Sequence, residues 1–208
     1  MALVTDLPSA AMSGPAPVPA SGPASASGLA AADGPERLTP VWMLVFLGLL
    51  GSAVLAGACW LSGHVHADTT LQTVARFFHV AALVVGLGAV LAVDWFAVLW
   101  LLGRRRLSDI TSTACALQIP IWFGLAGLTV TGLFLRPDLN SPLTLVKLGL
   151  VLAVTVNGLY AHWIGQRLDR YRDTPVPRAL LVQSGVAAAV SQCGWWGATF
   201  IGFLNSQS

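Results

Sequence analysis

The chain has 208 residues, enough for one domain and a tail. Apolar residues make up 55% of it and charged residues 10%, against about 25% charged in typical soluble proteins. Such a chain cannot cover a water-exposed surface, so a soluble enzyme is excluded. The net charge of +2 is too small to indicate a nucleic-acid partner. Three cysteines without CxxC spacing exclude a disulfide scaffold and a thiolate zinc site. The composition indicates an integral membrane protein.

The N-terminal segment differs in composition from the rest of the chain. Residues 1–39 are rich in Ala, Pro, Ser and Gly and have little apolar bulk. Burial of so few apolar groups cannot offset the entropy cost of ordering the segment, so we expect a disordered tail. Residues 40–208 then form a single transmembrane domain.

Five apolar stretches follow the tail, each long enough for the ~20 helical residues that cross a bilayer. Backbone groups in lipid need internal hydrogen bonds, which favours helices over isolated strands. We therefore expect an all-α membrane protein, a bundle of five transmembrane helices. The second stretch contains Asp94 and the fourth contains Lys147. The expected spans are 41–63, 77–103, 110–135, 143–164 and 179–204.

The distribution of Lys and Arg predicts how the chain lies in the membrane. With five spans, eight of the 11 basic residues fall on one side, in the tail, the loop of Arg104 and the loop that follows the fourth span. Arg76, Arg136 and Lys147 fall on the other side. The positive-inside rule then predicts a cytoplasmic N-terminus and an outside C-terminus in a bacterial inner membrane.

Ionisable residues inside the spans are candidate functional positions, because they are costly in lipid. Asp94 lies 15 residues after His79, and His162 lies 15 residues after Lys147. Both spans run inward, so His79 and Lys147 form an outer layer and Asp94 and His162 form an inner layer, about 22 Å apart. The two residues of each helix lie on one stripe of that helix.

The inner layer is expected to pair Asp94 with His162, with Asn157 and Tyr160 nearby. This pair could be an ion pair, a proton relay or a clamp between the two helices, and the clamp is the favoured interpretation. In the outer layer, His79 and Lys147 can both be cationic. We therefore expect Lys147 to extend to the lipid headgroups.

The segment between the first two spans reads Gly-His-Val-His-Ala-Asp. Alternate residues of an extended chain project to one side, so His64, His66 and Asp68 could converge on a zinc or copper ion, with His79 as a fourth ligand. The other interpretation is that these side chains are simply solvated.

Haem is a further cofactor to consider. Its axial ligands must lie at similar depth. His79 and His162 lie near opposite faces, about 25 Å apart in depth, which excludes them as a pair. A haem b near the outer face, held by His79 and either His64 or His66, remains open.

Several short sequence motifs in the second half of the chain occur together in one kind of protein. They include IWFGL at 121–125, LTVTG at 128–132, NGLYAH at 157–162 and IGFLN at 201–205. With the segment from His79 to Asp94, they make residues 75–206 resemble a widespread group of uncharacterised bacterial multi-pass membrane proteins. The resemblance implies a helical inner-membrane protein in which Lys147, Asn157 and His162 belong to a recurring motif. It implies no activity. A looser similarity links the chain to copper-resistance and haem-binding membrane bundles.

Three functional hypotheses follow. The first is a non-enzymatic subunit, scaffold or accessory component of a membrane complex, because the sequence has no phosphate-binding loop, metalloprotease motif or partnered nucleophile. The second is a haem- or metal-binding redox protein with its site on the outer side. The third is a small proton-coupled transporter that uses Asp94 and His162. The expected partners are the lipid bilayer and other membrane subunits.

Overall fold

The computed structural model describes residues 38–171 and 174–205. The described part of the chain is all-helical and contains no strand, as expected. The predicted disordered tail lies outside the described residues, except for its last two. The elements are α1 (Val41–Ser62), α2 (Thr69–Leu101), α3 (Leu107–Phe134), α4 (Pro142–Leu168), the 3-10 turn η1 (Asp169–Tyr171) and α5 (Arg178–Leu204).

The helix bounds agree with the expected spans except at the start of α2. This helix begins at Thr69, eight residues before the expected position. Asp68 explains the difference, because its Oδ1 accepts a hydrogen bond from the backbone N–H of Leu71 at 2.7 Å. An Asp at this position satisfies one of the free N–H groups of the first turn and so fixes the helix start.

Four helices are long and apolar enough to cross a membrane, namely α1, α2, α3 and α4 together with η1. Helix α5 has 27 residues and occupies the expected fifth range, but Gln183 and Gln192 make it less apolar. Many large apolar side chains point outward, and Ile119 and Phe123 are 78% and 71% exposed. Hydrocarbon is the natural surrounding for such a surface. The protein is a multi-pass membrane protein.

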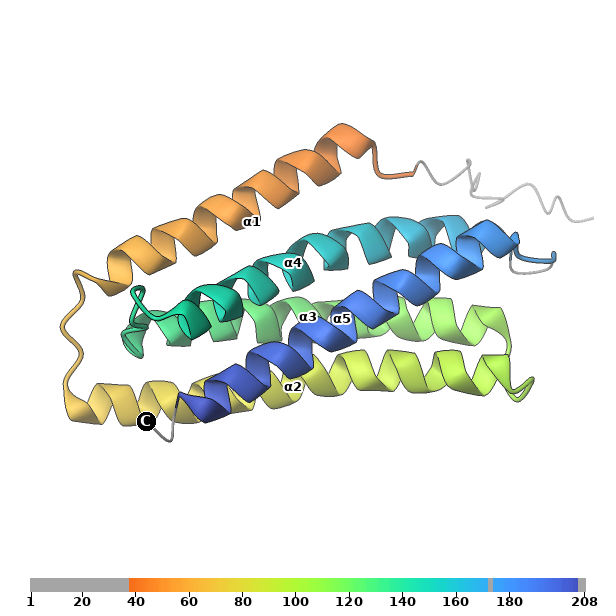
Figure 1. Ribbon diagram of the computed structural model, residues 1–208. Helices are drawn as coiled ribbons and strands as arrows, with labels where there is room; N and C mark the ends of the chain where they lie inside the picture. The colour runs from red at the N-terminus through yellow and green to blue at the C-terminus, as the bar shows by residue number, and fades with distance from the viewer. Residues whose placement is uncertain (1–37, 172–173, 206–208) are drawn as a thin grey trace, which may run out of the picture. The chain divides into compact units, whose positions relative to one another are not determined.

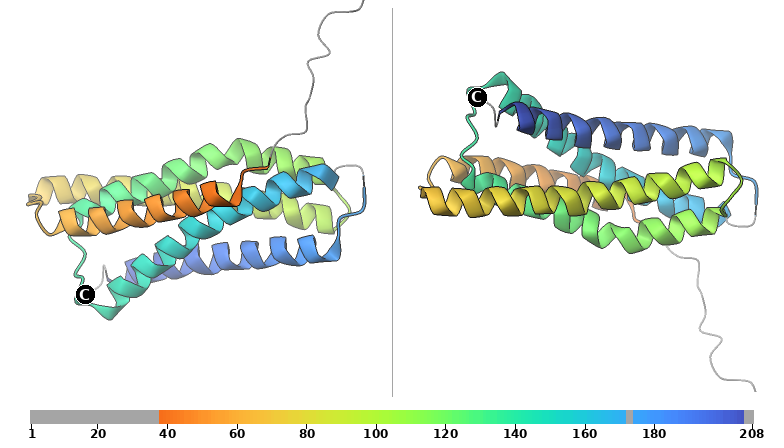
Figure 2. Two further views of the ribbon diagram at one scale, coloured as in Figure 1. Left: turned by 90° about the horizontal axis from the view of Figure 1, so that it is seen from above. Right: turned by 90° about the horizontal axis from the view of Figure 1, so that it is seen from below.

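Successive helices reverse direction, so the loops gather at two ends (Figure 1). The end that holds the loop of His64 lies on the left of Figure 1, and the end that holds the loop of Arg104 lies on the right. We call them the His64 end and the Arg104 end. Helix α2 packs along α3, and α4 packs along α5, while α1 contacts α3 and α4 (Figures 1 and 2). The domain is therefore two helical hairpins plus α1.

The α2–α3 hairpin depends on a close backbone approach. A Cβ atom added at Gly124 would lie 2.6 Å from Cα of Gly86, and one added at Gly127 would lie 2.9 Å from Cβ of Ala82. Between α4 and α5, a Cβ added at Gly194 would overlap Val154. Helices in lipid associate mainly through such close packing, because apolar side chains gain little by leaving hydrocarbon.

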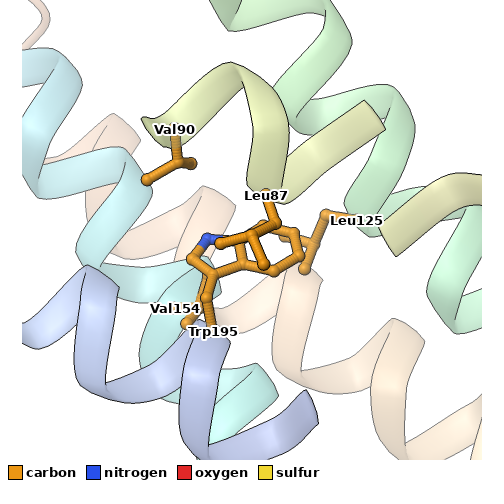
Figure 3. Close-up of a cluster of buried hydrophobic side chains, with 5 residues drawn as sticks. All are labelled: Leu87, Val90, Leu125, Val154 and Trp195. Carbon is orange, nitrogen blue, oxygen red and sulfur yellow. The ribbon is translucent and has the colours of Figure 1, made fainter. Parts of the chain in front are cut away.

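The two hairpins meet around Trp195 of α5. Its indole packs with Leu87 and Val90 of α2, Leu125 of α3 and Val154 of α4 (Figure 3). Trp195 is 3% exposed, so it is one of the most buried side chains of the described residues. One large aromatic residue thus joins four helices.

We expect Gly86→Ala to destabilise the protein and Gly88→Ala to stabilise it slightly. A Cβ at Gly86 would lie 2.7 Å from Cη2 of Trp195, whereas one at Gly88 has no neighbour within 4 Å. Both changes raise helix propensity by about 1 kcal/mol, but overpacking at residue 86 costs about 1–3 kcal/mol. Thermal unfolding in detergent measures the difference. Equal midpoints for the two variants would contradict the close crossing.

Candidate functional site

A cavity of about 740 Å³ opens between the hairpins at the His64 end. All five helices contribute to its lining, through the second halves of α1, α3 and α5 and the first halves of α2 and α4. Its volume lies within the ~300–1,000 Å³ of sites for small organic ligands. The cavity exists because the hairpins diverge beyond the contact at Trp195.

The inner part of the cavity is apolar. Leu125, Val154 and Trp195 of the core cluster line it, together with Leu83 and Val151. The Trp195 Nε1–H is buried and has no hydrogen-bond partner among the described residues. An unpaired donor of this kind is uncommon in a packed core. The inner wall suits a hydrocarbon or ring system.

The outer part of the cavity carries an excess of positive charge. Among the described lining residues, Arg76, Arg136 and Lys147 are the Lys and Arg side chains, and Asp138 is the one carboxylate. The arginines are exposed, whereas Lys147 is half-buried. Cations above an apolar wall attract an anion that carries an apolar body.

Arg136 has an unusual backbone conformation. Its φ is +49°, and it is the one non-glycine residue with positive φ among the described residues. It directly follows the Leu135 C-cap of α3, a position usually taken by glycine because a Cβ is disfavoured there. Its Nε donates to the carbonyl of Val65 at 3.4 Å and so links two loops. A positive φ in a residue that has a Cβ stores about 1–3 kcal/mol of backbone strain, which the surrounding contacts must balance.

Lys147 is half-buried near the start of α4, and its expected extension to the lipid headgroups stays a prediction. It lines the cavity, and a Cβ added at Gly202 of α5 would come 3.3 Å from its Nζ. The absence of a side chain at Gly202 leaves room for the ammonium group.

His79 also lines the cavity, so the structure brings the two members of the outer layer to one site. Its Nδ1 lies 2.8 Å from the Thr131 hydroxyl oxygen, and Thr131 Oγ1 donates to the carbonyl of Gly127 at 2.6 Å. The imidazole is thereby fixed against α3.

The other expected metal ligands do not join His79. Among the described residues, no group of three or more His, Cys, Asp or Glu side chains could hold a metal ion. His64 Nδ1 donates to the Trp60 carbonyl at 2.9 Å, and its ring packs on that of Trp60. Asp68 caps α2, and His66 is exposed. His64, His66 and Asp68 are not lining residues of the cavity. His64 and Asp68 do not converge on one point, because each already has a hydrogen bond at a helix end. His64 bonds to the end of α1, and Asp68 bonds to the start of α2.

The inner layer is arranged differently from the expectation. Asp94 does not contact His162 in the described part of the chain, because its Oδ2 accepts a hydrogen bond from Nε2 of Gln192 on α5. Gln192 Oε1 in turn accepts from the indole N–H of Trp196 at 2.9 Å. The carboxylate therefore joins α2 to α5, whereas the expected clamp joined α2 to α4 through His162.

His162 belongs to a separate network of amide groups. Its Nδ1 lies 2.9 Å from Nε2 of Gln118 on α3, and its Nε2 lies 3.0 Å from Nε2 of Gln166. Gln166 also bonds to Thr39, whose backbone N–H donates to Oε1 at 2.9 Å. This network joins α3, α4 and the residues that precede α1.

Asn157 and Tyr160 have separate contacts. Asn157 Nδ2 donates to the carbonyl of Ala187 on α5 at 2.8 Å, which ties the α4–α5 hairpin together. Tyr160 is exposed and its ring stacks on Trp163. Neither residue contributes to an Asp94–His162 pair.

Several polar residues that form contacts between helices or line the cavity were not among the predicted site residues. Gln118, Gln166 and Gln192 are uncharged, so a search for ionisable residues in the spans passed over them. Each glutamine lies within an apolar stretch or at its end, and this is the signal that could have found them. Arg76 and Arg136 were considered only as topology markers, although both line the cavity.

A double-mutant cycle can test the partner of Asp94. We expect Asp94→Ala and Gln192→Ala to show a coupling energy of about 0.6–1.7 kcal/mol, the range of hydrogen bonds between membrane helices. The corresponding cycle of Asp94→Ala with His162→Ala should give less than about 0.3 kcal/mol, because residues without a shared contact act independently. Reversible unfolding in mixed micelles provides the free energies. A larger coupling with His162 would contradict the observed pairing.

No protein-family model, curated protein or solved structure matches this chain.

Proposed function

We propose that this protein binds an amphiphilic anion in the cavity at the His64 end, as a non-catalytic accessory component of the membrane. The proposal rests on the charged residues that line the cavity. Three Lys and Arg side chains and one carboxylate lie above an apolar inner wall. The anionic group of the ligand lies among Arg76, Arg136 and Lys147, and its apolar body reaches the wall around Trp195.

The half-buried position of Lys147 favours its electrostatic interaction with an anion. Lys147 is half-buried between α4 and α5, and no carboxylate is paired with it among the described residues. A cation in partly apolar surroundings interacts more strongly with an anion than a fully hydrated one does. Arg136 supports the same function, because its strained backbone places a guanidinium group at the cavity.

Transport coupled to protons is less well supported. Such a mechanism would use Asp94 and His162, but these residues contact different glutamines and neither lines the cavity. The contacts of both residues favour a structural role, which leaves the cavity as the site of function.

For the membrane itself, we propose the bacterial inner membrane with a cytoplasmic Arg104 end. The resemblance to bacterial multi-pass proteins and the excess of arginines at that end support this placement. The cavity then opens toward the outside, and α5 is the fifth span.

Reporter fusions test the orientation and the crossing by α5 together. Alkaline phosphatase fused after Ser208 should be active, because the enzyme folds only outside the cytoplasm, while a fusion after Arg104 should be inactive. If α5 does not cross, both fusions would be inactive. Activity at Arg104 alone would reverse the orientation.

Cys59 offers a direct test of anion binding, because it lines the cavity while Cys115 and Cys193 do not. In a Cys115→Ser/Cys193→Ser background, we expect oleate to slow the maleimide labelling of Cys59 and oleyl alcohol to do so far less. The two compounds share a chain and differ in charge. Removing two cations with Arg136→Gln/Lys147→Gln should raise the oleate concentration needed for protection about tenfold or more.

The matched control is Arg104→Gln/Arg178→Gln, which removes two cations at the other end and should leave protection unchanged. Equal protection by oleate and oleyl alcohol, or none by either, would refute anion binding in the cavity.

A further inference from the structure

The hydrogen bonds around His79 indicate which of its ring nitrogens carries the proton. A threonine hydroxyl has one proton, and at 2.6 Å Thr131 donates it to the Gly127 carbonyl. The Thr131 oxygen can therefore only accept from His79, so Nδ1 carries the proton. In a neutral ring with Nδ1 protonated, the lone pair is on Nε2. The lone pair belongs to a side chain that lines the cavity.

A free imidazole lone pair is of no use to a fatty acid anion, since both are electron donors. It is the usual ligand of a transition metal, and ligating histidines generally donate their other N–H to a fixed acceptor, as Nδ1 does here. A bare metal ion fits poorly, because Arg76, Arg136 and Lys147 line the same cavity and would repel it. The ligand must combine a metal with negative charge and an apolar body.

We propose that the amphiphilic anion is an iron porphyrin, with His79 Nε2 as its axial ligand. The inference rests on the proposed function and names its ligand. The macrocycle provides the apolar body, and its two carboxylates provide the negative charge. Arg76 lies three residues before His79 in α2, slightly less than one helical turn or about 4.5 Å along the axis, and it supplies a cation for one of these carboxylates.

The structure offers one histidine for this iron, not two. His64 is bonded to Trp60, and neither His64 nor His66 lines the cavity. The expected pairing of His79 with one of them is therefore replaced by single ligation, which leaves one coordination position open. The reduced complex should then bind carbon monoxide, as proximal-histidine haem proteins with an open position do.

The test is a titration of the full-length detergent-purified protein with haemin, followed by the Soret band. We expect one haemin per chain and a carbon monoxide spectrum after dithionite reduction. His79→Ala should weaken binding at least tenfold, and added imidazole should restore the Soret band. His64→Ala and His66→Ala serve as matched controls and should bind as the wild type does.

Thr131→Val provides a second variant that keeps His79 and the shape of residue 131. It removes the acceptor of Nδ1–H, so haemin affinity should fall about 10-fold to 100-fold, as for other outer-shell partners of metal-bound histidines. Unchanged affinity in both Thr131→Val and His79→Ala would overturn ligation by His79.

Metal-free protoporphyrin separates this inference from the proposed function. Equal affinity for protoporphyrin and haemin would overturn iron ligation while leaving anion binding in place. Failure to bind either porphyrin, with Cys59 still protected by oleate, would overturn the porphyrin alone. Failure of both porphyrins and oleate would overturn both proposals.

Discussion

Close contact between backbones is the constraint on which the rest of this structure depends. Apolar side chains gain little by leaving hydrocarbon for a protein interior, so helices associate where small residues let them approach. Gly86 meets Gly124, and Gly194 receives Val154, which produces two tight hairpins. The hairpins themselves join through the large indole of Trp195, and they separate on the His64 side of it. The cavity is a consequence of this uneven packing.

Polar contacts between the helices are constrained by the same apolar surroundings. A carboxylate or imidazole within a bundle needs a partner, and the partners of Asp94 and His162 are glutamine amides. An amide can donate and accept at once, so Gln192 joins Asp94 to Trp196, and Gln166 joins His162 to Thr39. Neutral partners avoid the cost of placing a second charge in a medium of low dielectric constant. These contacts fix helix positions away from the cavity.

The cavity differs from the rest of the interior, because three cations and one carboxylate, Asp138, are found among its described lining residues. If stability alone had determined the sequence, Lys147 would have an acidic partner or be a neutral residue. Glycine would take the place of Arg136, where the backbone is left-handed. Both features cost stability, and the proposed binding of an anion would offset that cost. They lie in the cavity that His79 also lines.

The sequence by itself determined the membrane class, the helical fold and most helix bounds. These depend on composition, on apolar length and on local capping, which are properties of neighbouring residues. It also placed His79 and Lys147 at one depth, since depth is counted along single helices. Only the tertiary structure decided which residues meet. Helix rotation and the choice of neighbours arise from glycine contacts between distant segments, so Asp94 met Gln192 instead of His162, and two arginines expected to mark topology came to line a cavity.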